Sequence, residues 1–545
     1  MKRLFYFMLA ATLLSFGLPS RVFAQQQQDQ DRQGDQRGGP ERGGHAAMHE
    51  DDTLNPNGCR PSDIEEKTSV TQHSIRIGGE TIPYTATAGF ILLKNDKGEP
   101  TGLMYSVAYT RSDVKDLSTR PISFLYNGGP GSATLWLHMG AYGPRRIVTT
   151  NAPEFTPPAP FQIVDNTETL LDKSDLVFID AMGTGYSHAV CKGKPQDFYG
   201  IDEDIDAFGQ FIDTYISRNN RWMSPKFLIG ESYGTFRSAA LGNYLQDRYS
   251  MQLNGIVLMS SVLDLSTITF GPGDDRPYEF YLPSYAAVAW YHNMLKNKPA
   301  DLPGFIQQAR EYAYGDYAAA LAKGSTISAQ EKSAVAAKLS SFTGLSEDYL
   351  IKADLRVKLG QFMAELERRE GKTVGRIDAR FTGDTLDLLE ETAEGDPEGP
   401  AVGGAFTAAV NEYTNNELKF GKGMVYNNSI VGARSWNWKR RPNPFQRGGF
   451  FPGAPNVEGD LAHAMVTNPY LHVQVENGYF DFATPFFATE YTMDHLGLPP
   501  NLEKNISLKY YMAGHMMYLH TPDRVLLHNN VAAFIEANIH PESAK

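Results

Sequence analysis

The chain of 545 residues is short of basic residues, of cysteines and of long apolar runs. It carries 50 Lys and Arg against 63 Asp and Glu, a formal charge of −13. This balance argues against a nucleic-acid partner, which would need a basic face. The two cysteines, Cys59 and Cys191, allow one disulfide between them, and two separate buried thiols are the open alternative. Beyond the N-terminal region no apolar run is long enough to span a membrane.

The N-terminal region has the composition of a targeting segment. Two basic residues precede an apolar run over residues 4–18, and small residues follow it up to Ala24. This pattern predicts a secretory signal peptide over residues 1–24, with an uncleaved anchor helix as the alternative. Residues 25–58 are rich in Gln, Asp, Arg and Gly and are predicted to form a disordered leader. We expect a secreted protein, periplasmic or extracellular.

The remaining chain alternates strand-like and helix-like segments, which predicts an α/β fold with a mostly parallel sheet. The apolar content of 41% is ample for a large core. Strands with alternating patterns are expected first, then short buried strands of the parallel type. The expected strands are 71–77, 81–87, 89–93, 103–109, 122–126, 176–180, 227–229, 256–259, 471–475 and 506–511.

The helix-like segments divide the chain into parts. An amphipathic helix is expected over residues 201–217, and the expected closing helix covers 523–539. Between the two groups of strands the pattern is largely helical, at 302–314, 328–339 and 346–368. The predicted parts are a core over 59–265, a helical insertion lying over the site at 266–428, and the rest of the core at 429–545.

The stretch Gly230-Glu-Ser-Tyr-Gly234 follows a buried strand and precedes a helix-like segment. A G-x-S-x-G pattern in that context predicts a nucleophile elbow, in which a strained turn exposes the serine at the carboxyl end of the sheet. The alternative is an ordinary strand–helix turn. The nucleophile would be Ser232.

A serine hydroxyl needs a base, and the base needs a third group to orient it. His515 is the histidine that directly follows a late strand, whereas His520 and His528 fall in a loop and in the last helix. Asp481 follows the strand 471–475 and is the preferred acid. The competing acid is Asp264, at the end of the strand after the elbow; Asp494 lies in a helical stretch and is expected to be solvated.

An oxyanion hole needs backbone N–H groups that face the developing charge. One is expected from Tyr233, the residue after the nucleophile. The other is expected from Asn127-Gly-Gly-Pro-Gly131, which directly follows the strand 122–126. A phosphate-binding turn is the alternative, but no Lys-Ser/Thr follows and the Rossmann spacing is missing.

Five motifs, in order from about residue 120 to the C-terminus, closely resemble the serine carboxypeptidase family of the carboxypeptidase Y type. They are Asn127-Gly-Gly-Pro-Gly131, Asp180 with Gly183-Thr-Gly-Tyr-Ser187, Gly230-Glu-Ser-Tyr-Gly234, Asp481 and Ala513-Gly-His-Met516. The resemblance implies an α/β-hydrolase fold with a helical insertion, and removal of C-terminal residues from peptides. It implies no cofactor and no metal.

The resemblance also implies roles for individual residues. Ser232, Asp481 and His515 would form the triad, and the N–H groups of Gly129 and Tyr233 the oxyanion hole. The terminal carboxylate of a peptide substrate would be bound by Asn127, Gly128 and Glu231. An ionised Glu231 would repel that carboxylate, so the two acids are expected to share a proton.

The sequence departs from the family pattern at two positions. Family members carry a second Glu about fourteen residues after the loop Asn, where this chain has Ala141; many also have Cys where this chain has Ser132. The carboxylate site is therefore expected to be simpler or differently built. The competing hypotheses are an esterase or acyltransferase on the same scaffold, and a non-catalytic binding protein that keeps the fold.

Overall fold

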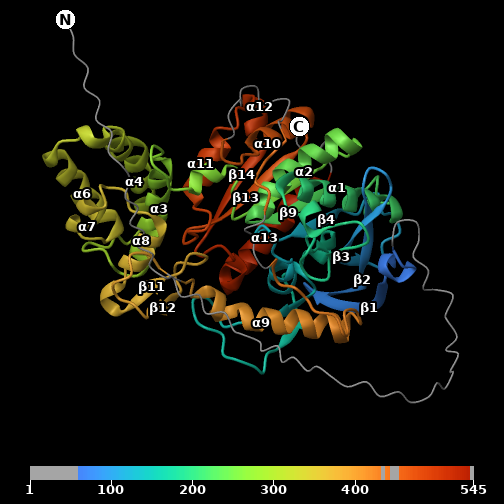
Figure 1. The fold of residues 1–545 in the computed structure, drawn as a ribbon. Coiled ribbons are helices and arrows are strands. Elements are labelled where there is room, and N and C mark those ends of the chain that lie inside the picture. Colours follow the sequence, from blue (N-terminus) through green and yellow to red (C-terminus); the bar gives the residue numbers. More distant parts are fainter. Residues whose placement is uncertain (1–58, 394, 431–435, 442–452, 540–545) are drawn as a thin grey trace, which may run out of the picture. The chain divides into compact units, whose positions relative to one another are not determined.

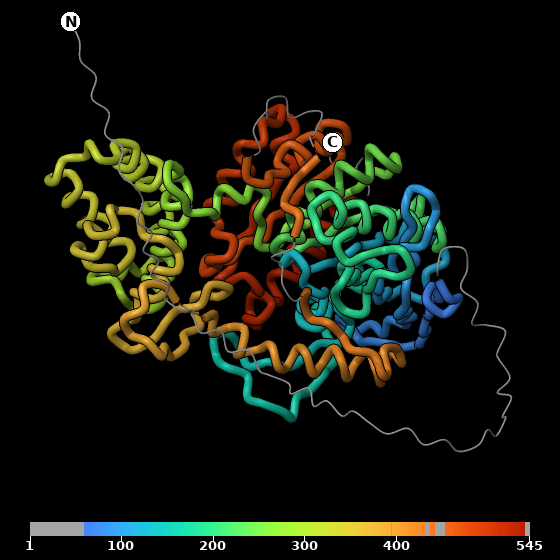
Figure 2. Tube along the Cα trace, in the orientation of Figure 1, coloured from blue at the N-terminus to red at the C-terminus, as the bar shows by residue number. Residues whose placement is uncertain are grey.

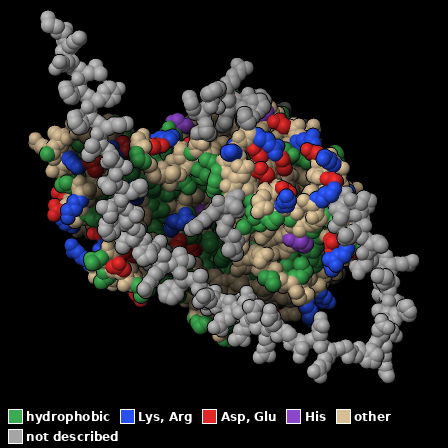
Figure 3. Space-filling view, viewed as in Figure 1, with side chains coloured by type: hydrophobic (Ala, Val, Ile, Leu, Met, Phe, Trp, Pro, Cys, Tyr) green, Lys and Arg blue, Asp and Glu red, His purple; other side chains and the backbone are tan. Residues whose placement is uncertain are grey.

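The computed structural model describes residues 59–393, 395–430, 436–441 and 453–539. The predicted signal peptide at 1–24 and leader at 25–58 lie outside the described residues. In the described part of the chain no helix is long and apolar enough to cross a membrane. The face shown in Figure 3 carries acidic and basic side chains interspersed with hydrophobic ones.

The core is a ten-stranded sheet in the order β1-β2-β3-β7-β4-β9-β10-β13-β14, with β8 paired to β3 (Figure 1). The first three strands and β7 pair antiparallel, and the strands from β7 to β14 run parallel. Their bounds are β1 Thr68–Ile77, β2 Glu80–Lys94, β3 Pro100–Arg111, β4 Ile122–Tyr126, β7 Asp175–Ile179, β8 His188–Ala189, β9 Lys226–Glu231, β10 Gly255–Met259, β13 His472–Gly478 and β14 Ile506–Tyr511. This is the predicted class: a mostly parallel sheet with antiparallel N-terminal strands.

Apolar side chains of the buried strands serve two cores, one on each face of the sheet. Phe227 of β9 packs in one core with the C-terminal helix α13 (Thr521–Ala537), while its neighbour Leu228 packs in the other. The second core lies under α1 (Ile201–Arg218), α2 (Tyr233–Tyr249) and α10 (Glu458–Thr467). Because both faces of these strands are buried, their sequences are nearly continuous apolar runs.

A mainly helical segment separates β10 from β13, and Figure 1 shows its helices α3 to α8 grouped beside α11. It has a hydrophobic core of its own, which also takes in Phe480, Phe482 and Phe486 from the segment after β13. The bounds in this segment are α3 Arg276–Tyr291, α4 Leu302–Tyr312, α5 Ala318–Leu321, α6 Ala329–Thr343, α7 Glu347–Lys352, α8 Leu359–Glu365, β11 Lys372–Val374, β12 Thr382–Asp384 and α9 Glu398–Glu412. The helices α11 (Phe486–Asp494) and α12 (Pro500–Glu503) follow β13.

The helix α9 lies apart from α3 to α8. It contacts the helical turn Leu137–Tyr142 and the strand β5 (Arg145–Ile147), which pairs with β6 (Ile163–Asp165). In Figure 2 the orange trace of α9 runs beside the teal trace that contains these segments. Residues from distant parts of the sequence therefore meet next to the loop after β4.

Two expectations differ in detail from the structure, and one element is additional. The strands expected at 81–87 and 89–93 form one strand, β2, because the chain passes Gly89 without a break and Lys67 lies against it. The helix expected at 346–368 is split into α7 and α8 by the left-handed residues Asp354 and Leu355. The hairpin β11–β12 was not expected.

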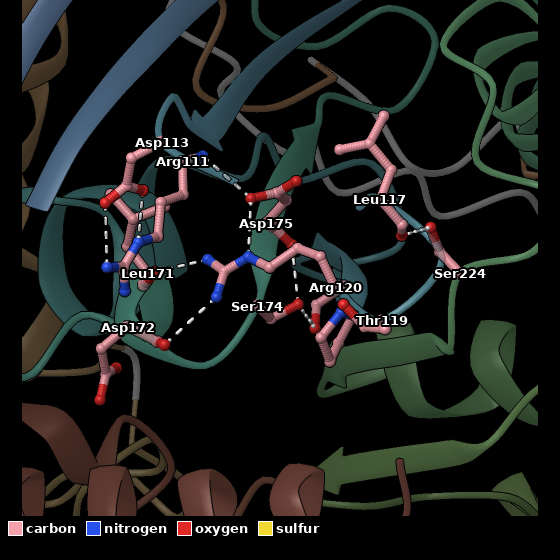
Figure 4. A network of polar contacts seen from close by, with 12 residues as sticks. Arg111, Asp113, Leu117, Thr119, Arg120, Leu171, Asp172, Ser174, Asp175 and Ser224 are labelled. Atoms are coloured by element: carbon pink, nitrogen blue, oxygen red, sulfur yellow. Dashed lines mark hydrogen bonds and ion pairs between the residues drawn. The ribbon is translucent and has the colours of Figure 1, made fainter. Parts of the chain in front are cut away.

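A polar network and a disulfide tie segments of the core together. Figure 4 shows a polar network at the amino end of β7, where Asp175 accepts hydrogen bonds from Nε of Arg120 at 3.1 Å and from the backbone N–H of Arg111 at 3.0 Å. A disulfide joins Cys59 to Cys191, with 5.1 Å between their Cα atoms. The question that the sequence left open is settled in favour of pairing.

Candidate active site

The turn between β9 and α2 holds Ser232 in a conformation that non-glycine residues rarely adopt, with φ 61° and ψ −130°. The flanking glycines make this turn possible. A Cβ on Gly230 would come within 2.2 Å of the carbonyl oxygen of Gly234, and a Cβ on Gly234 within 2.9 Å of that of Tyr126. The N–H of Ser232 donates to Met259 of the neighbouring strand at 3.0 Å. The sequence therefore builds the strained turn of a nucleophile elbow.

Asp481 and His515 meet at the carboxyl ends of β13 and β14. Nδ1 of His515 lies 2.8 Å from Oδ2 of Asp481. The carboxylate is buried and also accepts the backbone N–H groups of Ala483 at 2.7 Å and Thr484 at 3.0 Å. With Asp481 on Nδ1, the imidazole can keep Nε2 free to accept a proton.

Ser232 and His515 line the same cavity. No direct hydrogen bond joins Oγ of Ser232 to His515 among the described residues, and such contacts commonly tighten only when substrate binds. Burial opposes protonation of His515, but the charge and hydrogen bond of Asp481, helped by Glu231, outweigh it and raise the pKa of the imidazole.

The competing residues lie elsewhere. Asp264 caps a short helical turn, where its carboxylate accepts the N–H of Ser266 at 2.8 Å. Asp494 ends α11. His520 pairs with Asp523 at 2.6 Å, and His528 hydrogen-bonds the carbonyl of Glu168 at 3.0 Å. None of these four competitors lines the cavity that holds Ser232 in the described structure.

The loop after β4 lies against the N-terminus of α2. A Cβ on Gly128 would come within 2.3 Å of the backbone nitrogen of Tyr233, and Gly129 has φ +106°, so both positions favour glycine. Nη1 of the buried Arg237 donates to the carbonyl of Asn127 at 2.8 Å, and its Nε donates to Asp204 at 2.7 Å. The loop is thereby held where its N–H groups can face the same point as that of Tyr233.

Glu231 is buried at the end of β9, directly before the nucleophile. Nδ2 of Asn127 donates to its Oε1 at 2.7 Å. Burial raises the pKa of Glu231 to about 7, although the charge of His515 and the polar groups of Tyr518 and Asn127 oppose the shift. The side chain is therefore largely protonated at mildly acidic pH and can donate a hydrogen bond.

A second buried acid reaches the cavity from α9. Glu398 is the first residue of that helix, and burial raises its pKa well above the usual range, with Asp378 and Asp396 adding to the effect. In the described structure Oε1 of Glu398 and Oε2 of Glu231 are buried without a hydrogen-bond partner of good geometry, and the hydroxyl of Tyr518 lies close to Glu231. Glu231 and Glu398 line the same cavity, and two unsatisfied carboxyl oxygens there indicate a site for a polar ligand.

Glu398 could not be found from the sequence, because its place depends on how α9 packs. Gly140 allows that packing: a Cβ there would lie 2.8 Å from the ring of Tyr518 and 2.9 Å from that of Phe406 in α9. The neighbouring Ala141 is buried; it stands where members of the resembled family carry a second Glu. An acid from another element thus enters the site.

The cavity has a volume of about 280 Å³. Its described lining consists of Asn127, Gly128, Gly129, Ser132, Trp136, Glu231, Ser232, Arg376, Ile377, Asp396, Glu398, Gly399, Val402, His515 and Met516. Cavities that take whole drug-sized ligands are roughly 300–1,000 Å³, so this one suits a group of about one amino acid. Within the described ranges no group of three or more His, Cys, Asp and Glu is placed to hold a metal ion.

Comparison with known proteins identifies the fold. No family model matches the chain, and no curated protein matches it. Among solved structures, Kex1(delta)p, a prohormone-processing carboxypeptidase from Saccharomyces cerevisiae, is similar with a TM-score of 0.50 and 13% identity, over 83% of this chain and 91% of that one. At this identity the likeness shows the fold alone.

Two further structures match a similar share of this chain, with lower TM-scores. The proline iminopeptidase of Mycobacterium smegmatis covers 87% of this chain and 100% of its own, with 13% identity and a TM-score of 0.35. A putative aryl esterase from Burkholderia cenocepacia covers 83% and 99%, with 12% identity and a TM-score of 0.34. The fold is that of the α/β hydrolases, as predicted; the resemblance to the carboxypeptidase Y type remains a prediction.

Proposed function

We propose that this protein is a serine carboxypeptidase, which removes the C-terminal residue of peptides through an acyl-enzyme. The observation that carries the proposal is the pair of buried carboxyl oxygens on Glu231 and Glu398 that lack a hydrogen-bond partner and line the same cavity as Ser232. A general esterase has no need of two protonated acids next to its nucleophile. A substrate that ends in a carboxylate does, because each neutral acid can donate a hydrogen bond to it.

The chemistry follows from the proposed triad. His515 takes the proton of Ser232 as Oγ attacks the carbonyl carbon of the last peptide bond. The resulting oxyanion accepts the N–H groups of Gly129 and Tyr233. The C–N bond then breaks as His515 returns the proton to the leaving nitrogen. Water, deprotonated by His515, attacks the acyl ester and releases the shortened peptide.

The terminal carboxylate is proposed to bind Asn127, Gly128 and Glu231, with Glu398 as a further donor. This arrangement explains how the site can work with Ala141 in place of an acid. Asn127 and Glu231 are already joined at 2.7 Å, which fixes the free oxygen of Glu231 for the substrate.

An esterase or acyltransferase on the same scaffold is the second candidate, because fold and triad leave the acyl acceptor undetermined. The lining also contains the apolar side chains of Trp136, Val402 and Met516, which suit a neutral leaving group. A blocked dipeptide, its C-terminal amide and a matching ester separate the candidates. Preference for the free acid supports the carboxypeptidase; preference for the ester or amide supports the alternative.

We further propose that the protein is exported after removal of residues 1–24. The disulfide between Cys59 and Cys191 supports an oxidising compartment, since such bonds rarely persist in a reducing cytosol. Fractionation of the producing cells, with mass spectrometry of the mature N-terminus, tests this proposal. Labelling by a fluorophosphonate probe tests whether the protein is catalytic at all.

A further inference from the structure

Arg376 is the one Lys or Arg among the described residues that line the cavity of Ser232. Its side chain is exposed, and within the described ranges no carboxylate pairs with it. Arg380, four residues on, shows the usual arrangement for contrast, because it forms a buried ion pair with Asp378 at 2.5 Å. An unpaired guanidinium at a cavity is available for an anionic group of a ligand.

The backbone around Arg376 is hydrogen-bonded to the segments that carry Asp481 and His515. The N–H of Phe482, next to Asp481, donates to the carbonyl of Arg376 at 3.0 Å. The N–H of His515 donates to the carbonyl of Ile377 at 2.8 Å. Arg376 therefore starts from a defined position relative to the reacting atoms, and its charge is close enough to lower the pKa of His515.

Within the described ranges no acid of the cavity forms an ion pair with Arg376. Asp396 accepts the backbone N–H of Ile377 at 3.0 Å and that of Glu398 at 3.3 Å. Glu231 and Glu398 are buried, and burial favours their neutral forms. The cavity thus offers two different sites for carboxylates: neutral hydrogen-bond donors in its buried part and a fixed positive charge at its exposed part.

We propose that Arg376 is a specificity-determining residue that pairs with the side-chain carboxylate of a C-terminal Asp or Glu. The inference rests on the proposed carboxypeptidase function, in which the leaving residue fills this cavity. Its terminal carboxylate occupies Asn127, Glu231 and Glu398, which leaves Arg376 for the side chain. A guanidinium suits this role because it binds a carboxylate through two parallel hydrogen bonds.

The test compares two pairs of N-blocked dipeptides with free C-termini. The first pair is phenylalanyl-glutamate and phenylalanyl-glutamine, which differ in the leaving residue. The second pair is glutamyl-phenylalanine and glutaminyl-phenylalanine, which differ on the acyl side. The proteins are wild type, Arg376→Gln, Arg376→Lys and Arg369→Gln. The last removes an exposed charge from the same segment but away from the cavity.

We expect wild type to favour leaving glutamate over leaving glutamine by about tenfold in kcat/KM, and by less at high salt because the charge is exposed. Arg376→Gln should bring the ratio to about one; because the charge of Arg376 also lowers the pKa of His515, an effect of the variant on the triad changes both substrates equally and leaves the ratio as it was. Arg376→Lys should keep part of the preference, and Arg369→Gln all of it. Circular dichroism should show all four proteins equally folded.

Three results would overturn the inference. An equal loss on both leaving residues in Arg376→Gln would mean that the cation acts on the terminal carboxylate or on the triad. A preference confined to the second pair of substrates would mean that Arg376 binds a carboxylate on the acyl side of the cleaved bond. An unchanged ratio would leave Arg376 without a role in selection. In each of these cases peptide cleavage itself persists, whereas a wild type that cleaves no free-acid peptide overturns the proposed function as well.

Discussion

The pH dependence of peptide cleavage should depend on the proton that Glu231 and His515 share across the site. The catalytic form needs Glu231 protonated and His515 neutral. The ion pair, with the proton on His515, holds the same number of protons but repels the substrate carboxylate and lacks a base. The two groups therefore titrate as a coupled pair, and the pH profile for free-acid peptides should be bell-shaped.

The alkaline side follows from the pKa of Glu231, which burial raises from 4.5 to about 7. The proton is present below that pH and is lost as pH rises through it. At pH 8 roughly one-tenth of Glu231 remains protonated, so kcat/KM for a free-acid peptide should fall about tenfold between pH 6 and pH 8. The C-terminal amide of the same peptide has no carboxylate to repel and should show no such fall.

Glu231→Gln should change both sides of the profile. A neutral amide donates at every pH, so the alkaline fall should flatten. Removal of the nearby carboxylate also removes one cause of the raised pKa of His515, so the acid limit should move to lower pH. Glu279→Gln is the matched control, because burial raises the pKa of Glu279 to about 7 as well, but in helix α3.

The assay is kcat/KM against pH from 5 to 9, for wild type and both variants, on paired free-acid and amidated peptides. Ionic strength is held constant, since exposed charges such as Arg376 respond to salt. If all alkaline limbs coincide, Glu231 does not bind the terminal carboxylate. The carboxypeptidase proposal would then give way to a general hydrolase.

Four other substitutions test the site and the core. Ser232→Ala should lower turnover by about 10³-fold or more and abolish fluorophosphonate labelling, with folding unchanged by circular dichroism. Asp481→Asn should cost roughly 10⁴-fold in kcat, because His515 loses its oriented tautomer. Asp264→Asn should leave kcat unchanged and cost less than about 1 kcal/mol in thermal unfolding, because Asn caps a helical turn about as well as Asp; swapped results would move the acid to Asp264. Burial raises the pKa of Glu476 from 4.5 to about 7, so its stabilising contribution is complete below pH 4.5 and is lost as pH rises through 7. In wild type this loss lowers the free energy of unfolding by on the order of 3 kcal/mol. Glu476→Gln carries no group that ionises, so its free energy of unfolding should lack this part of the fall.

The sequence predicted the parts of the fold that depend on local pattern. The runs at 122–126 and 256–259 are apolar on both faces, and they form β4 and β10 within one residue. The elbow at Ser232 was predictable because glycine is required on both sides of it. Asp481 and His515 were predictable because each directly follows a strand of the parallel sheet.

The missed features depend on packing between distant segments. Glu398 reaches the cavity because α9 lies against the turn at 137–142, and the helical pattern of α9 contains no sign of that neighbour. Arg376 is held by backbone bonds to segments more than a hundred residues further along the chain. The hairpin β11–β12 has three residues a strand, too few for a pattern to be visible.

The order of strands in the sheet has a consequence for synthesis on the ribosome. β10 pairs with β13, yet about 210 residues lie between Met259 and His472. At a translation rate of ~5–20 residues per second, the edge of β10 stays unpaired for about 10–40 s until β13 is synthesised. During that time the nascent chain presents an unpaired, fully apolar strand, which is a template for aggregation. The yield of this protein in a host should therefore depend on chaperones that cover this edge, and on how quickly the helical segment is translated.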